Sequence, residues 1–113
     1  MASFAWRKPP IGTTIVLKFS ELKAGELVMV YDRQPTGGGW WKPGRIEGPE
    51  REVPARVTAP NGPTAVLVRY LATRARRSTA AFELHRIRRV PSPALAALLA
   101  ELLDGGPGTG AGR

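Results

Sequence analysis

The chain has 113 residues and carries 17 Lys and Arg against 9 Asp and Glu, which gives a formal net charge of +8 and a pI near 11.1. This length supports one domain with one modest core, and the charge favours a polyanionic partner, most commonly nucleic acid. The chain has no cysteine and no apolar run near the roughly 20 residues that span a bilayer. These absences exclude disulfides, thiolate metal sites and a membrane-spanning segment, and we expect an intracellular protein, nuclear or cytoplasmic.

Residues 1–20 form a basic N-terminal arm, with Arg7, Lys8 and Lys18 and no acidic residue before position 20. Within this arm, residues 13–19 (TTIVLKF) are rich in β-branched side chains, which favour an extended conformation. We therefore expect an edge strand there.

A barrel of short strands is predicted for residues 21–91. Residues 26–31 (ELVMVY) are apolar on both faces, which is typical of a strand covered on both sides. A loop at 35–39 (PTGGG) separates this strand from the next, at 40–47. Pro43-Gly44 interrupts that second strand and predicts a bulge or a sheet edge.

The second half of the barrel is predicted from its turns. Asn61-Gly62 supplies the positive φ angles of a tight hairpin between strands at 53–59 and 65–72. An arginine-rich turn, a strand, one 3₁₀ turn and a closing strand follow at 73–78, 79–84, 83–86 and 87–90. Several short strands separated by turn signals predict a mainly β fold, a small five-stranded barrel.

The segment 92–104 is predicted to be a short C-terminal helix, with Ser92 as its N-cap and Pro93 as its first residue. About ten residues are marginal for an isolated helix, so it must pack on something. Either it docks on its own barrel, or it binds a second copy or another protein. Residues 105–113 contain five glycines and are predicted to be a disordered tail. The apolar face that would form the contact consists of Leu95, Leu98, Leu99, Leu102 and Leu103.

Residues for catalysis are poorly supplied. His85 is the only histidine, and the glutamates at 47, 50 and 52 alternate with arginines in a loop. Two His or Cys ligands for zinc cannot be assembled, and no Ser–His signature is present. Gly37–Gly39 lacks the Lys-Ser/Thr of a phosphate-binding loop. We predict no catalytic residue, no metal site, no cofactor and no enzymatic activity.

Arginines are concentrated between residues 61 and 90, where seven of them face a single acidic residue. Guanidinium groups bind phosphate through bidentate hydrogen bonds, and adjacent strands would align them as a stripe. The plainer interpretation is a solvated basic face without a ligand. The predicted phosphate-binding residues are Arg69, Arg74, Arg76, Arg77, Arg86, Arg88 and Arg89.

Aromatic residues offer a second kind of surface. Trp40 and Trp41 follow the glycine loop, and alternation along a strand places them on opposite faces. With Tyr31 and Tyr70 nearby, an exposed ring could stack on a base or contribute to a cage for a methylated cation. The alternative is a tryptophan that only covers apolar surface at the rim.

Three segments together resemble a known family. Residues 22–32 (LKAGELVMVYD) resemble the opening of the SH3-like barrels at the C-terminus of retroelement integrases. Residues 41–46 (WKPGRI) are similar to the W-x-x-G-R-I strand of the Pao-type version, and 83–87 (ELHRI) to its short ending. Glu26 stands where this family usually has Asp. Tudor and agenet barrels share part of the pattern.

The resemblance implies a nonspecific DNA-binding module of an integration complex, with its basic strands, including Lys42 and Arg45, against the phosphate backbone. We therefore predict sequence-nonspecific binding of DNA or RNA. One alternative is a Tudor-like reader of methylated or Arg-rich peptides. It requires three or more aromatic rings to converge on one rim, drawn from Tyr31, Trp40, Trp41, Tyr70 and Phe82. Another is a structural subunit of a ribonucleoprotein.

Overall fold

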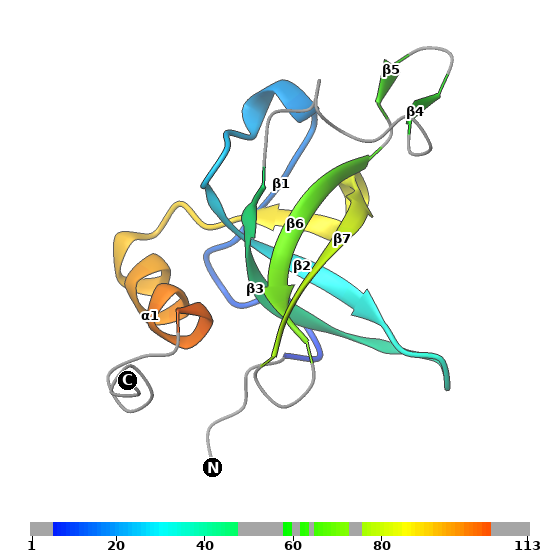
Figure 1. Cartoon of the computed structure of the whole chain (residues 1–113). Coiled ribbons are helices and arrows are strands. Elements are labelled where there is room, and N and C mark those ends of the chain that lie inside the picture. Colours follow the sequence, from blue (N-terminus) through cyan, green and yellow to red (C-terminus); the bar gives the residue numbers. More distant parts are fainter. Residues whose placement is uncertain (1–5, 48–57, 60–61, 64, 73–75, 105–113) are drawn as a thin grey trace.

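The computed structural model describes residues 6–47, 58–59, 62–63, 65–72 and 76–104 (Figure 1). Six strands form one antiparallel sheet in the order β1-β8-β2-β3-β6-β7. Their bounds are β1 (Thr14–Ile15), β2 (Leu27–Arg33), β3 (Gly39–Ile46), β6 (Ala65–Leu71), β7 (Arg77–Glu83) and β8 (Ile87–Arg89). The smaller elements are β4 (Thr58–Ala59), β5 (Gly62–Pro63), 3₁₀ turns at Phe19–Glu21 and Leu84–Arg86, and helix α1 (Pro93–Leu103).

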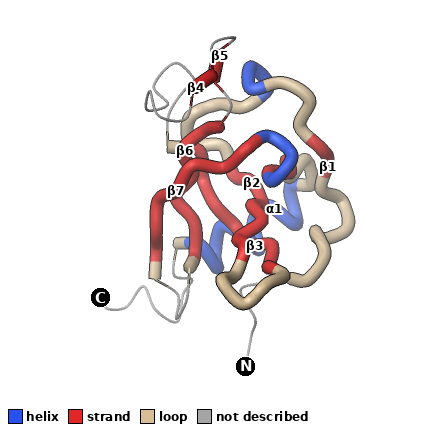
Figure 2. The backbone as a smooth tube through the Cα atoms, turned by 90° about the vertical axis from the view of Figure 1, so that its right-hand side faces the viewer, coloured by secondary structure: helices blue, strands red, loops and turns tan. Residues whose placement is uncertain are grey.

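These elements confirm a mainly β chain with a short C-terminal helix. The described sheet has six strands where five were predicted, and it is not closed: β1 and β7 lie at its two ends (Figure 2). The predicted hairpin between strands at 53–59 and 65–72 is wrong, because β6 pairs with β3 and β7. The short strand β4 pairs instead with β5, with Ala59 opposite Gly62. Residues 53–57 and the tail at 105–113 lie outside the described residues.

Of the bulge or sheet edge predicted at Pro43-Gly44, the bulge is wrong, whereas Pro43 does lie at an edge position, since β3 pairs with β6 only from Gly44 onward. β2 and β3 pair without interruption from Leu27↔Arg45 to Arg33↔Gly39, and Pro43 and Gly44 keep their places in this register. Gly44 has a different purpose. A Cβ atom there would lie 2.7 Å from Val68 Cγ1 and 2.9 Å from the Arg69 carbonyl oxygen, so only glycine lets β6 approach this closely.

Two other boundaries differ from expectation. The N-terminal edge strand is only Thr14–Ile15, because the chain turns into a 3₁₀ helix from Phe19. β7 begins at Arg77, inside the segment predicted to be a turn, because each residue from Arg77 to Glu83 pairs with β6. Pairing across the sheet therefore extends β7 beyond what its own sequence indicates.

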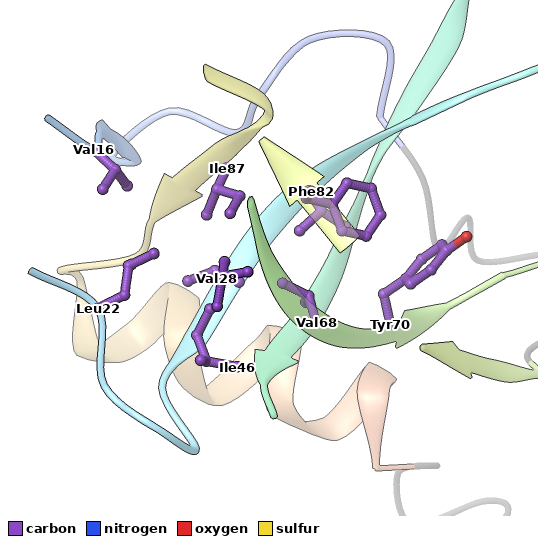
Figure 3. Close-up of a cluster of buried hydrophobic side chains, with 10 residues drawn as sticks. Val16, Leu22, Val28, Ile46, Val68, Tyr70, Phe82 and Ile87 are labelled. Atoms are coloured by element: carbon purple, nitrogen blue, oxygen red, sulfur yellow. The ribbon is translucent and has the colours of Figure 1, made fainter. Parts of the chain in front are cut away.

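The main core lies on one face of the sheet, here called the inner face (Figure 3). Alternate residues of the strands supply it, so that Val28 and Val30 are fully buried there. Its members are Val16, Leu22, Val28, Val30, Ile46, Val66, Val68, Tyr70, Phe82 and Ile87.

Helix α1 covers part of the opposite, outer face and packs against β2 and β3 (Figure 1). Met29, between Val28 and Val30, points to this face and is fully buried there. The Ser92 hydroxyl accepts from the Leu95 amide at 3.3 Å, which confirms the predicted cap. The helix is thus docked on its own sheet.

The five leucines of the predicted contact face are distributed unequally by this docking, and Leu103 is buried. Leu99 is buried against the chain itself, and Leu95 and Leu102 are half-buried. Leu98 remains 51% exposed.

Candidate nucleic-acid interface

Three arginines from three neighbouring strands line one cleft on the outer face, beside the end of α1. The cleft measures about 400 Å³ and is lined by Arg45 of β3, Arg69 of β6 and Arg77 of β7, among others. Arg45 lies directly opposite Arg69 in the register, and Arg69 lies opposite Thr79, two residues from Arg77. Residues paired across strands share a face, so the three side chains emerge on the same side. We call this set the arginine cleft.

Two carboxylates also line the arginine cleft. Glu47 Oε2 lies 2.9 Å from Arg69 Nε, and Asp104 Oδ2 lies 3.1 Å from Arg45 Nη2. The side chains of the first pair are 55% and 33% exposed. Exposed ion pairs of this kind contribute only about 0–1 kcal/mol, so a stronger anion can replace the carboxylates. Three cations against two acids also leave an excess of positive charge.

Arg77 connects the arginine cleft to the helix. Its Nε donates to the carbonyl of Leu103, the last residue of α1, at 2.9 Å. A cation at this position satisfies a free carbonyl and opposes the negative end of the helix dipole. The bond uses one of the five N–H donors of the guanidinium, which leaves the others for a ligand.

The basic surface continues along β7. A second hollow of about 390 Å³ is lined by Arg69, Arg77, Ser78 and Thr79, so it shares two arginines with the first. Arg76 directly precedes the strand and is exposed. Arg74, which was also predicted to bind phosphate, lies outside the described residues.

The predicted arginines near β8 are held by the protein itself. Arg86 donates from Nε and Nη2 to the Tyr31 carbonyl, at 3.1 and 2.6 Å, and lies over the Phe82 ring. Arg88 donates from Nε to Thr13 Oγ1 and from Nη2 to the Thr13 carbonyl, both at 2.9 Å. Both side chains are half-buried, and their hydrogen bonds connect separate segments of the chain.

Arg89 is likewise paired, with its Nε 2.7 Å from Glu26 Oε2. The carboxylate of Glu26 is only 17% exposed and also accepts from the Lys23 amide. The stripe of seven arginines predicted from the sequence is therefore divided: part lines the arginine cleft, and part joins segments of the fold.

Lys42, predicted as a phosphate contact, is buried on the inner face. Its side chain is 7% exposed, and Nζ lies 2.7 Å from Asp32 Oδ2. The Tyr70 hydroxyl lies 3.4 Å from the other oxygen of the same carboxylate. Burial first, and then the charge of Asp32, raises the pKa of Tyr70 above its ordinary value of 10.0. These polar groups complete one end of the core and do not contribute to the arginine cleft.

The aromatic residues are divided between the two faces. Trp40 pairs across strands with Asp32 and Trp41 with Tyr31, which places the two tryptophans on opposite faces, as predicted. Tyr31 and Trp41 pack with ring centroids 5.4 Å apart. The rings considered for a cage are dispersed, because Tyr70 and Phe82 form an edge-to-face pair within the core, whereas Tyr31 and Trp41 lie together on the opposite face.

The N-terminal segment meets β3 at these tryptophans. The amide of Trp6 donates to the Trp41 carbonyl at 2.9 Å, and the Trp41 amide donates to the Trp6 carbonyl at 2.7 Å. The Arg7 guanidinium lies 4.8 Å from the centre of the Trp40 ring. This part of β3 is thus covered on its second edge by the N-terminal arm.

The two acidic residues of the arginine cleft were not predicted from the sequence. Asp104 entered the predictions only as the last residue of the helical segment 92–104, and Glu47 only as part of a charged loop. The position of these carboxylates beside the arginines depends on the register of β3 with β6 and on where α1 ends against the sheet. Neither can be predicted from a single sequence.

Within the described residues, no group of three His, Cys, Asp or Glu could hold a metal ion, and no helix is long and apolar enough to cross a membrane. Comparisons of the chain with protein-family models, with curated proteins and with solved structures find no match. The functional conclusion therefore rests on the arrangement of these side chains.

Proposed function

We propose that this chain is a sequence-nonspecific nucleic-acid-binding module, built as an SH3-like barrel, whose arginine cleft holds backbone phosphates. The observation that carries the proposal is the convergence of Arg45, Arg69 and Arg77 from three adjacent strands. Five consecutive strands in the order β8-β2-β3-β6-β7, with one 3₁₀ turn between β7 and β8, are compatible with such a barrel.

Binding would proceed by anion exchange. A phosphate entering the arginine cleft takes the place of Glu47 beside Arg69 and of Asp104 beside Arg45. A phosphate offers more acceptor oxygens than a carboxylate, and the planar guanidinium fork binds it through two parallel hydrogen bonds. Contacts of this kind position the nucleic acid but carry no base information, which is why we propose nonspecific binding.

Duplex DNA is the ligand that the resemblance to retroelement integrase barrels favours, and a role within an integration complex is part of the same proposal. RNA phosphates would satisfy the same guanidinium groups. The experiment therefore also decides between DNA and RNA, by comparing duplexes of the same sequence.

The test is a titration of short DNA and RNA duplexes at several salt concentrations, followed by fluorescence anisotropy. Arg45→Ala combined with Arg69→Ala, both in the arginine cleft, should reduce the slope of log K against log salt by about 1.8, since each phosphate contact on duplex DNA contributes about 0.9. The matched control is Lys18→Ala with Lys23→Ala, which removes the same charge from exposed positions outside the arginine cleft.

Equal losses in the two double variants would show that binding follows net charge alone and would refute the arginine cleft as the site. Salt-independent binding of the unmodified chain would refute phosphate recognition altogether.

A further inference from the structure

The sheet ends in two very different edges (Figure 2). β1 contributes two residues, whereas β7 contributes seven, from Arg77 to Glu83, paired with β6 in one unbroken register. Among the described residues, no strand pairs with the other edge of β7. Proteins usually protect a sheet edge by shortening it, or with a proline or a bulge. β1 is short in this way. β7 is long and contains neither a proline nor a bulge, and its charged residues, Arg77 and Glu83, stand only at its two ends.

The sequence of β7 (RSTAAFE) is complementary to itself in the antiparallel sense. If two copies of β7 pair around a twofold axis at Ala80, Arg77 of each copy faces Glu83 of the other. In the same register, Ser78 faces Phe82. Opposite charges then meet at both ends of the paired strands, and opposite charges directly across an antiparallel pair stabilise it.

Other registers lose this match. Centring the pair on Thr79 or on Ala81 leaves a charged end without its counterpart, because Arg77 would then face Ala81, or Glu83 would face Thr79. The charges therefore select one register as well as one partner.

The side chains available at this edge suit such an approach. Arg77 and Glu83 are exposed, and the residues between them are small, apart from Phe82, which is buried in the core. Arg77 uses Nε for the Leu103 carbonyl, so its terminal nitrogens remain for a carboxylate. His85 Nε2 lies 3.9 Å from Glu83 Oε1, and both side chains are more than half exposed. This contact is therefore weak and competes little with an ion pair between Glu83 and Arg77 of a second copy.

We infer that the chain forms a homodimer by antiparallel pairing of β7 with β7 of a second copy. The six strands of each copy would then continue into one sheet across a twofold axis perpendicular to it. Such an axis places both outer faces, and hence both arginine clefts, on the same side of the dimer. The dimer itself does not depend on the proposed nucleic-acid binding.

The experiment exchanges charges across the junction and measures mass by sedimentation equilibrium on nucleic-acid-free protein. Glu83→Arg alone places Arg opposite Arg77, and Arg77→Glu alone places Glu opposite Glu83. Each single variant should weaken the dimer at least about tenfold, because like charges brought together across an interface are strongly unfavourable. An equimolar mixture of the two variants should dimerise again, since each copy then presents charges opposite to those of the other.

Leu98→Glu is the matched control, because it adds a charge to the exposed surface of α1 without touching β7. It should leave the dimer intact. A monomeric unmodified chain, a dimer that survives both single charge reversals, or a dimer lost in Leu98→Glu would each overturn the inference, the last in favour of the helix as interface. If Arg77→Glu does not fold, Glu83→Arg combined with unmodified chain decides the question: the mixed pair retains one of the two ion pairs and should be intermediate in strength.

Discussion

Arginines at the two ends of the sheet have opposite relations to their surroundings. Near β8, Arg86 and Arg88 are half-buried and donate to backbone and hydroxyl oxygens of distant segments. Near β7, Arg69 and Arg77 are exposed, and a carboxylate or a single helix carbonyl accepts from them. The same residue type thus joins segments of the fold at one end and faces solvent at the other.

This difference shows that the count of arginines in a basic segment overstates the ligand surface. Arg86 and Arg88 each donate two hydrogen bonds to neutral oxygens from half-buried positions, so they are committed to the fold, whereas Arg77 donates only one from an exposed position. An exposed carboxylate can leave at a cost of about 1 kcal/mol or less, so its arginine can exchange partners.

We expect the largest effect on stability from a substitution that removes the hydrogen bonds of an arginine near β8. Arg88→Ala removes two hydrogen bonds to Thr13 that tie the N-terminal segment to the sheet, and hydrogen bonds to charged groups contribute about 1.5–3 kcal/mol. We expect a loss of about 2 kcal/mol in the free energy of unfolding, measured by urea denaturation. The salt slope of nucleic-acid binding should change far less than in the variant that combines Arg45→Ala with Arg69→Ala. A loss of slope without a loss of stability would reverse the assignment of the two ends.

A smaller effect, on phosphate affinity, tests the function of the two carboxylates in the arginine cleft. Glu47→Gln with Asp104→Asn removes the two competing carboxylates while keeping their shape, so phosphate affinity should rise. The rise is expected to be several-fold, because each exposed pair contributes at most about 1 kcal/mol. Glu101→Gln provides the comparison, as it removes an acidic charge from the exposed side of α1. An equal gain per charge at Glu101 would attribute the effect to net charge rather than to the carboxylates of the cleft.

The smallest effect concerns Tyr70, which follows Arg69 on β6 but points to the inner face. Burial raises its pKa in the folded chain above 10.0, so the folded state holds the hydroxyl proton more firmly than the unfolded state. This contribution to stability is complete below pH 10.0 and is lost as the pH rises through the higher pKa of the folded chain. Urea denaturation in this alkaline range should show a shallower decline for Tyr70→Phe, whereas nucleic-acid affinity at neutral pH should not change. An unaltered alkaline decline would place the responsible group elsewhere.

Local features of the sequence predicted much of the fold. The apolar faces of residues 26–31 and the Ser92 cap depend on neighbours along the chain, and both predictions are confirmed. The extent of β7 and the unbroken pairing at Pro43-Gly44 depend on contacts across the sheet, and these were predicted wrongly.

The arginine cleft could be predicted only in part, for the same reason. Charge clustering identified Arg69 and Arg77, but the facing of Arg45 and Arg69 requires the register of β3 with β6. The burial of Lys42 with Asp32 could not be predicted either. Strand alternation shows that alternate residues share a face, but it does not show which of the two faces is the inner one.

The contact of the N-terminal arm with β3 has a practical consequence for measurement. All three tryptophans of the chain, Trp6, Trp40 and Trp41, lie where this arm meets the strand. Intrinsic fluorescence of the protein therefore reports on whether the arm is seated, and only indirectly on the outer face beside the helix end. A spectral change on adding a polyanion would signal release of the arm, and a ligand confined to the arginine cleft would be optically silent.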